Sequence, residues 1–205
     1  MRIQAKSHER KAELIIVAAQ KRFATYGIEK TTMREIAADL QMTKGSLYYY
    51  FPDKENLYMA VVEKEQAEFI RVLQEDLKNI SDPVEGLKKY VINRLSYFKT
   101  LVNLSRMRTE SFTQFKPLIA NSMIRFRENE KLFVKDLLDK GVVERIFSID
   151  NTQETASLFL DLLRGLRGTL LSDKKLLIIE DDEYKLMADK AIRFTDIFIN
   201  GLRDK

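Results

Sequence analysis

Cysteine is absent from this chain of 205 residues, and histidine occurs once, as His8. Without cysteine there can be no disulfide, no thiolate zinc site and no cysteine nucleophile, which suits a cytosolic protein. One histidine near the N-terminus leaves too little material for a general base, a zinc centre or a catalytic triad. A glycine-rich phosphate loop is missing too. We therefore expect no enzyme, no cofactor and no metal site.

Long apolar runs are also absent. No stretch approaches the roughly 20 residues that a membrane-spanning helix needs. The first eleven residues are polar and charged and lack the apolar core of a signal peptide. We therefore expect a cytoplasmic protein with no membrane partner.

Proline and glycine are scarce, with three and seven residues respectively, and most of them fall where a helix would end. No sustained alternation of apolar and polar residues marks a β-strand. The nearest candidate, residues 176–179, is short and flanked by charge. The sequence therefore predicts an all-α fold of about nine helices.

The expected helices begin with residues 7–26, where one apolar stripe contains Ile15, Ala19, Phe23 and Tyr26. Gly27 then stands where a helix stop favours a left-handed residue. Helices follow at 32–40, at 44–50 and at about 53–80, the last roughly 40 Å long. Further helices are expected at about 83–99, 101–113, 116–140, 152–171 and 182–202, with Gly141 as a stop.

Residues 32–51 read as two short helices joined by a tight turn. Thr32 and Glu35 have the spacing of a capping box. The positions expected to face inward are Ile36, Ala37, Leu40, Met42 and Leu47. The positions expected to face outward are Thr43, Lys44, Gly45, Ser46, Tyr48 and Tyr49. Exposed hydroxyl and ammonium groups can bind phosphates, and a glycine lets the backbone approach base edges closely, which is typical of a DNA-binding helix.

Charge gives weak support to this interpretation. Residues 1–60 hold ten basic and seven acidic residues, whereas the rest of the chain is nearly balanced. A polyphosphate partner favours such a positive surplus. The alternative is a plain helical hairpin with residues 48–51 as core aromatics. A seven-residue helix buries a single stripe, so it cannot bury three tyrosines and a phenylalanine together.

Residues 27–37 and 42–57 carry a specific resemblance, above all in the run Lys-Gly-Ser-Leu-Tyr-Tyr-Tyr-Phe from Lys44 to Phe51. This pattern resembles the signature of the tetracycline-repressor (TetR) family over about residues 8–68. The resemblance implies a three-helix DNA-binding domain at residues 1–52, with its helix-turn-helix motif at 32–51. It also implies an effector-binding and dimerisation domain at residues 53–205, joined by the long helix 53–80.

The resemblance also implies roles for individual residues at the DNA. Phosphates would be held by Thr32, Arg34, Thr43, Tyr49 and Lys54, while Lys44, Gly45, Ser46 and Tyr48 would lie nearest the bases. Gln41 departs from the family, which usually has glycine there. If that position is left-handed, glutamine costs about 1–2 kcal/mol. Tyr50 stands where histidine is common.

The last two helices are apolar over more than one face, which indicates burial against a second element, most simply a twin subunit. Gly165 and Gly168 would permit close approach of helices. The predicted dimer interface comprises Phe159, Leu163, Leu166, Leu170, Ile192, Phe194, Ile197 and Phe198. The family resemblance implies the same four-helix interface. The alternative is a buried central helix of a larger monomer.

The middle helices are rich in aromatic residues and methionine, and the resemblance implies a ligand cavity there. Adaptable apolar side chains suit such a cavity, although ordinary core packing would use the same residues. The predicted ligand-binding set is Arg94, Tyr97, Phe98, Met107, Phe112, Phe115, Met123, Phe126 and Arg164. Arg94, Arg164 and Arg167 interrupt apolar segments, so they either pair with an anionic ligand or with acids such as Asp161.

These features together predict a transcriptional regulator, most simply a repressor. It would bind a palindromic DNA operator as a homodimer, and a small apolar or amphipathic effector would release it. The alternative is a regulator or interaction protein that responds to a protein partner. A large exposed apolar patch beyond the dimer face would favour that alternative.

Overall fold

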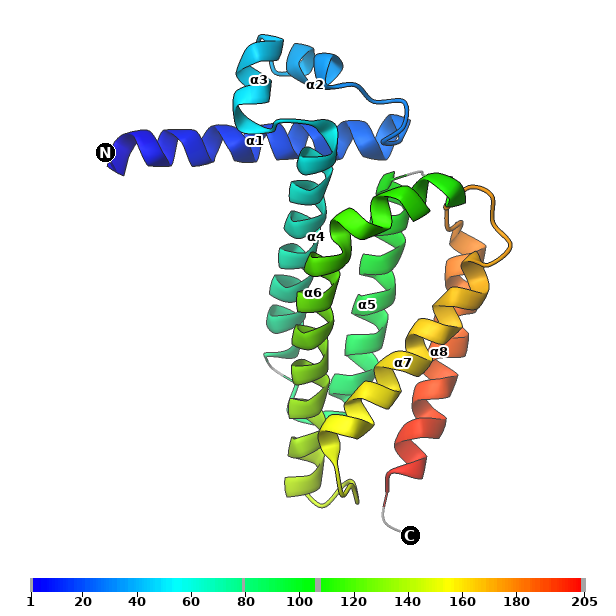
Figure 1. Cartoon of the computed structure of the whole chain (residues 1–205). Helices are drawn as coiled ribbons and strands as arrows, with labels where there is room; N and C mark the ends of the chain where they lie inside the picture. The colour runs from blue at the N-terminus through cyan, green and yellow to red at the C-terminus, as the bar shows by residue number, and fades with distance from the viewer. Residues whose placement is uncertain (1, 79, 106–107, 204–205) are drawn as a thin grey trace. The chain divides into compact units, whose positions relative to one another are not determined.

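The computed structural model describes residues 2–78, 80–105 and 108–203; the side chains of residues 2–6, 103–105, 109–112, 114 and 115 are not described. Over this part of the chain there are eight α-helices (Figure 1). They are α1 (Arg2–Tyr26), α2 (Met33–Asp39), α3 (Lys44–Tyr50), α4 (Lys54–Leu77), α5 (Pro83–Ser105), α6 (Thr109–Val143), α7 (Thr152–Leu171) and α8 (Asp181–Gly201). The expected all-α fold is confirmed.

The chain forms two compact units. The first unit comprises Met1–Gln66, Thr100–Ile119 and Lys175–Ile178, and the second comprises Ala67–Lys99, Ala120–Lys174 and Ile179–Lys205. Helices α4, α5 and α6 each contribute residues to both units.

The core of the first unit rests on the stripe of α1. Ile15, Ala19 and Phe23 are fully buried, as their spacing predicts. Tyr26 is 56% exposed, so its expected place in that stripe is wrong. The chain leaves the helix at the next residue, and the Tyr26 ring instead lies 5.4 Å from the Arg22 guanidinium. Gly27 has the left-handed backbone expected of it, with φ of 82°.

Local capping sets the boundaries of the next helices. The Thr32 side chain accepts a hydrogen bond from the Glu35 backbone N–H, and the Glu35 carboxylate accepts one from the Thr32 N–H, which confirms the capping box. The Thr43 hydroxyl caps α3 by accepting from the Ser46 N–H. Asp53 caps α4 by accepting from the Asn56 N–H at 2.6 Å.

The expected division of the middle helices is wrong. Instead of separate helices at 101–113 and 116–140, α5 continues to Ser105, and α6 runs unbroken through Pro117. Proline removes one backbone donor, but the helix retains its bonds on either side. Gly141 does not end α6, which continues to Val143. An added Cβ there would lie 2.1 Å from the Phe147 ring, so close packing requires the glycine.

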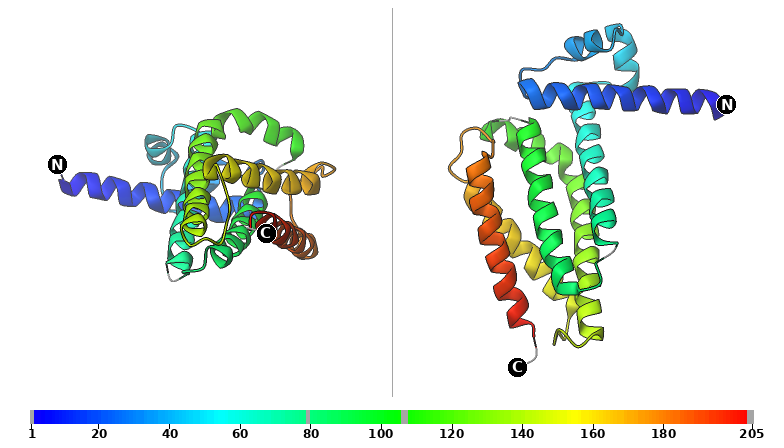
Figure 2. Two further views of the ribbon diagram at one scale, coloured as in Figure 1. Left: turned by 90° about the horizontal axis from the view of Figure 1, so that it is seen from below. Right: turned by 180° about the vertical axis from the view of Figure 1, so that it is seen from behind.

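The second unit contains the antiparallel pair α7 and α8, which lie side by side in all three ribbon views (Figures 1 and 2). Their bounds agree with the expected helices. The fully buried ring of Phe159 packs against Phe194 and Phe198, with centroids 5.8 and 4.9 Å away. Between these helices the strand candidate reduces to one antiparallel bridge of Leu176 with Arg108. No helix described is both long and apolar enough to cross a membrane.

Candidate nucleic-acid interface and effector region

Helix α3 presents a continuous polar face. Leu47 is its one fully buried side chain, and α3 packs against α2. The exposed positions are Thr43, Lys44, Gly45, Ser46, Tyr48 and Tyr49. Tyr49 is 74% exposed, although it is a large aromatic residue. Bare aromatic and hydroxyl groups on one short helix are suited to contact with DNA bases and phosphates.

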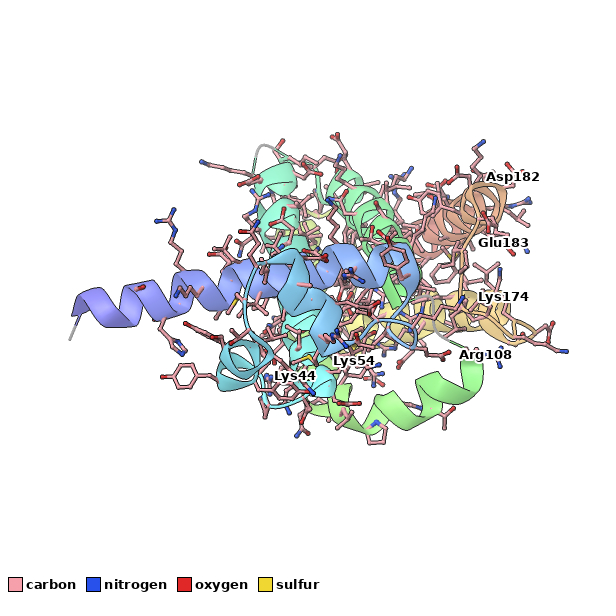
Figure 3. All side chains as sticks on the ribbon, turned by 90° about the horizontal axis from the view of Figure 1, so that it is seen from above. Lys44, Lys54, Arg108, Lys174, Asp182 and Glu183 are labelled. Atoms are coloured by element: carbon pink, nitrogen blue, oxygen red, sulfur yellow. The ribbon has the colours of Figure 1, made fainter. Side chains whose placement is uncertain are left out.

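Several predicted phosphate ligands already make internal contacts. The hydroxyls of Thr32 and Thr43 cap their helices, which orients both N-termini. The Lys54 ammonium donates to the carbonyl oxygens of Ile28 and Thr31, at 2.9 and 3.2 Å. An ammonium has three donors, so one N–H of Lys54 is left for a phosphate. Figure 3 shows Lys44 and Lys54 in this region.

The turn between α2 and α3 has a strained residue. Gln41 has φ of 51°, the left-handed conformation for which its family position usually has glycine. The Met42 N–H donates to the Ala37 carbonyl at 2.9 Å, which closes the turn around this residue. This hydrogen bond closes the turn with glutamine in the left-handed position.

A cluster of charges joins α1 to α2. The Arg22 guanidinium donates to the Asp39 carboxylate at 2.5 Å, and it lies 3.5 Å from Glu35. The hydrogen bond from Arg22 lowers the pKa of Asp39. The pKa of Glu35 is lowered mainly by its hydrogen bonds with Thr32, with a smaller effect of Arg22. These contacts fix the orientation of α2 on the long first helix.

Helix α1 contributes residues that the sequence did not predict to lie beside α3. The His8 ring lies 4.6 Å from Tyr50 and 5.6 Å from Tyr49. A hollow of about 700 Å³ lies between α1 and the helix-turn-helix motif, lined by Lys11 and Leu14 of α1 and by residues of the turn and of α3. Only the periodicity of α1 hinted at this, because His8, Lys11 and Leu14 lie three residues apart along the helix.

Three aromatic rings of the second unit form a cluster. Phe69 of α4 lies 4.7 Å from Tyr97 of α5 and 5.6 Å from Phe126 of α6, measured between ring centroids. Tyr97 and Phe126 are 5.3 Å apart. Tyr97 and Phe126 belong to the predicted ligand-binding set, whereas Phe69 was missed. Of the other predicted members, Met123 is half-buried. Met107 lies outside the described residues, and the side chains of Phe112 and Phe115 are not described.

Arg94 lies in the interior and is paired. Its guanidinium donates to Glu130 at 2.5 Å, and the Tyr90 hydroxyl donates to the same carboxylate at 2.7 Å. Arg94 is 5% exposed and Glu130 only 1%. Burial alone would lower the pKa of Arg94, but the Glu130 carboxylate outweighs it and the pKa is raised. Burial, helped by Glu130, raises the pKa of Tyr90.

Sequence reasoning missed Glu130, although a signal was present. It lies in a charged run, yet it is four residues from Phe126 and four from Val134, both buried. An acidic residue at such a position of an apolar stripe indicates a buried partner. Arg164, by contrast, pairs with Asp161 on the surface of α7, one helical turn away.

The predicted dimer residues divide between interior and surface. Phe159 and Leu163 are buried within the chain itself, at 1% and 2% exposure, while Ile197 is 65% exposed. The remaining members, Leu166, Leu170, Ile192, Phe194 and Phe198, are half-buried. The same two helices expose further apolar side chains, namely Leu158, Leu162 and Leu186. Added Cβ atoms on Gly165 and Gly168 would meet nothing within 4 Å.

A capped α2, a tight turn and an exposed α3 define a helix-turn-helix DNA-binding protein. Residues 15–61 match the family model of bacterial regulatory proteins of the tetR family. A transcriptional regulator from Cytophaga hutchinsonii is 39% identical, with a TM-score of 0.87 over 95% of this chain and 99% of that one. The chain belongs to the TetR family of transcriptional regulators.

Two further relatives extend this picture. The transcriptional regulator QacR of Staphylococcus aureus is 26% identical over 196 residues, which is 92% of this chain and 96% of that protein. A regulator from Saccharomonospora viridis, solved in complex with choline, shares the fold at a TM-score of 0.65 and 17% identity, covering 96% of this chain and all of that one. The relatives are transcriptional regulators, as the sequence predicts.

Proposed function

We propose that this regulator is a repressor that binds a palindromic operator as a homodimer and is released by a small-molecule effector. The exposed polar face of α3 carries the proposal, because a helix of that kind reads base edges in the major groove. The proposed site of action is the cytoplasm, and no catalytic step is part of the function.

The last two helices support the proposed dimer. Helices α7 and α8 expose Leu158, Leu162, Leu186 and Ile197, and apolar side chains on paired helices are suited to a four-helix interface. Two reading helices about 34–36 Å apart would address successive major grooves, so the operator is expected to be an inverted repeat. We place the division between the reading and effector domains near residue 52.

The effector would bind in the second unit. The cluster of Phe69, Tyr97 and Phe126 offers adaptable apolar surface from three helices. The Saccharomonospora viridis protein has the same fold and was solved in complex with choline, so in that relative the fold binds a small molecule. An effector that binds one arrangement of α4 to α6 better than another would shift the equilibrium between DNA-binding and released states.

The operator half of the proposal is tested by selecting bound sequences from random-sequence DNA. We expect an inverted repeat to be enriched, with two chains bound per duplex. On that duplex Lys44→Ala is expected to weaken binding about tenfold, because it removes a base-proximal contact. Lys78→Ala removes one exposed charge directly after α4 and is the matched control, expected to leave affinity unchanged. Failure to enrich any sequence would contradict the proposal.

The release half is tested separately on the same duplex, by screening small molecules for displacement of the protein. We expect at least one compound to weaken operator binding and, reciprocally, operator DNA to weaken binding of that compound. A compound that binds without changing operator affinity is not an effector.

A further inference from the structure

Three arginines interrupt the apolar segments of the second unit, and their surroundings differ. Arg94 is buried in its pair with Glu130 and the hydroxyl of Tyr90. Arg164 is paired with Asp161 on the surface of α7. Arg167 has no hydrogen bond or ion pair within the described residues. The positive charges of Arg94 and Arg164 are each matched, whereas that of Arg167 is not.

The position of Arg167 is nevertheless defined by packing. Its guanidinium carbon lies 4.1 Å from the centre of the Phe98 ring, well within the range of a cation–π contact. Phe98 is buried on α5, and Arg167 reaches it from α7. The side chain is half-buried, so its guanidinium is held against an aromatic face and can still be reached from outside.

The electrostatic surroundings of Arg167 are unfavourable for a cation. Burial and the neighbouring Arg94 guanidinium lower the pKa of Arg167 to about 10, with smaller contributions from Arg164 and Arg127. Glu130 acts in the other direction, but its carboxylate is committed to Arg94. A half-buried charge without a partner costs free energy, which an incoming anion would recover.

Aromatic residues of α5 lie close in sequence to Phe98, the ring that Arg167 contacts. Arg94, Tyr97 and Phe98 lie three and four residues apart on α5, so they share one side of that helix. Tyr97 belongs to the cluster with Phe69 and Phe126. A ligand that reached Arg167 with an anionic group would therefore have aromatic surface nearby for an apolar body.

We propose that Arg167 is the anion-recognising residue of the effector region, and that the effector is an amphiphile with a carboxylate or similar anionic group on an apolar body. This inference rests on the proposed effector function and deepens it. A quaternary ammonium compound, such as the choline bound by the Saccharomonospora viridis protein, would be repelled by the same guanidinium.

A pair of dyes that differ in one charged group tests the inference on the full-length chain. Anilinonaphthalene sulfonate is an anionic amphiphile, and N-phenyl-naphthylamine is its neutral counterpart; both fluoresce on binding apolar surface. We expect Arg167→Gln to weaken binding of the sulfonate dye about tenfold and to leave the neutral dye within twofold. Arg167→Lys, which keeps the charge but not the forked donors, should lose less.

Arg71→Gln is the matched control, because it removes an exposed arginine of the second unit that is already paired with Glu68 and Glu75. It should change neither affinity. Equal loss of both dyes in Arg167→Gln, unchanged sulfonate binding, or an equal effect of Arg71→Gln would each overturn the inference.

The outcomes also separate this inference from the proposed function. If the neutral dye binds but the sulfonate gains nothing from Arg167, the anion site is wrong while an effector cavity stands. If neither dye binds the native protein, the anion site is overturned, and the release mechanism is still decided by the displacement screen. If the dyes behave as expected but no compound displaces the operator, the anion site stands and the release mechanism fails.

Discussion

Gln41 shows how a single residue departs from its family without altering the fold. Its backbone is left-handed, at φ of 51°, where a side chain with a Cβ is strained. Hydrogen bonds of the Gln41 and Met42 N–H groups to the carbonyls of Ala38 and Ala37 hold the turn in place. These hydrogen bonds therefore hold the Gln41 backbone in its strained conformation.

Replacing Gln41 by glycine is expected to stabilise the protein by about 0.5–1 kcal/mol, because relief of strain exceeds the added entropy of the unfolded chain. Urea denaturation followed by circular dichroism measures this change. The control is Gln74→Gly, at an exposed right-handed position of α4, which should destabilise by about 1 kcal/mol. Loss of stability at both positions would contradict the strain at Gln41.

The buried pair of Arg94 and Glu130 sets a second expectation at the residue scale. Arg94→Met leaves the Glu130 carboxylate buried without its cation, so we expect a loss of about 3–5 kcal/mol in the free energy of unfolding. The double variant with Glu130→Gln removes both charges and keeps an acceptor for Tyr90. It should recover most of that loss in urea denaturation. Equal destabilisation of the single and double variants would show that the charge is not responsible.

At the scale of elements, the contact of α1 with α2 depends on Arg22, Asp39 and Glu35. The pKa values of both carboxyl groups are lowered in the folded protein, by the hydrogen bond of Arg22 to Asp39 and by those of Thr32 to Glu35. A lowered folded pKa means that the stabilisation is fully present above the unfolded values of about 4 and is lost as the pH falls through the folded values.

Arg22→Met is therefore expected to lower the melting temperature at pH near 7, and the difference from the native protein should shrink as the pH falls below about 4. Thermal unfolding followed by circular dichroism at several pH values measures this. Arg10→Met, on the exposed side of the same helix, is the control and should show no such dependence. A difference that stays constant down to pH about 3 would rule out the carboxylates as its cause.

At the scale of the whole molecule, the proposed function requires two copies of the chain. Ile197 of α8 is 65% exposed, and Leu162 of α7 is 42% exposed, although both are large apolar side chains. Exposure of these apolar side chains to water is unfavourable, and contact with a second copy of the chain would bury them. Phe159 and Leu163 of α7 are buried within the chain itself and are therefore part of its core.

Ile197→Glu is expected to convert the dimer into a monomer in sedimentation velocity, because an unpaired carboxylate would be buried at the interface. Operator affinity should fall more than tenfold, since each half-site would then be bound separately. Leu132→Glu changes an apolar residue of α6 that is also largely exposed, at 56%, and should leave the dimer intact. A dimer that survives Ile197→Glu would place the interface elsewhere.

The helix-turn-helix motif could be predicted from the sequence because its determinants are local. The capping box of Thr32, the left-handed Gly27 and the exposure of Tyr49 each follow from neighbours within a few residues. The bounds of α5 and α6 could not be predicted, because the continuation of α6 through Pro117 depends on tertiary packing rather than on propensity.

The sequence by itself determined that this chain is a helical regulator of the TetR family, since spacing and capping specify the reading helix. It offered Arg94, Arg164 and Arg167 as equivalent candidates for an anionic ligand. Only the tertiary structure distinguished them, by bringing Glu130 of α6 to Arg94 and Phe98 of α5 to Arg167. Glu130 is 36 residues from Arg94 along the chain, and Phe98 is 69 residues from Arg167. Helix packing brings these pairs together, and the periodicity of a single helix does not specify that packing.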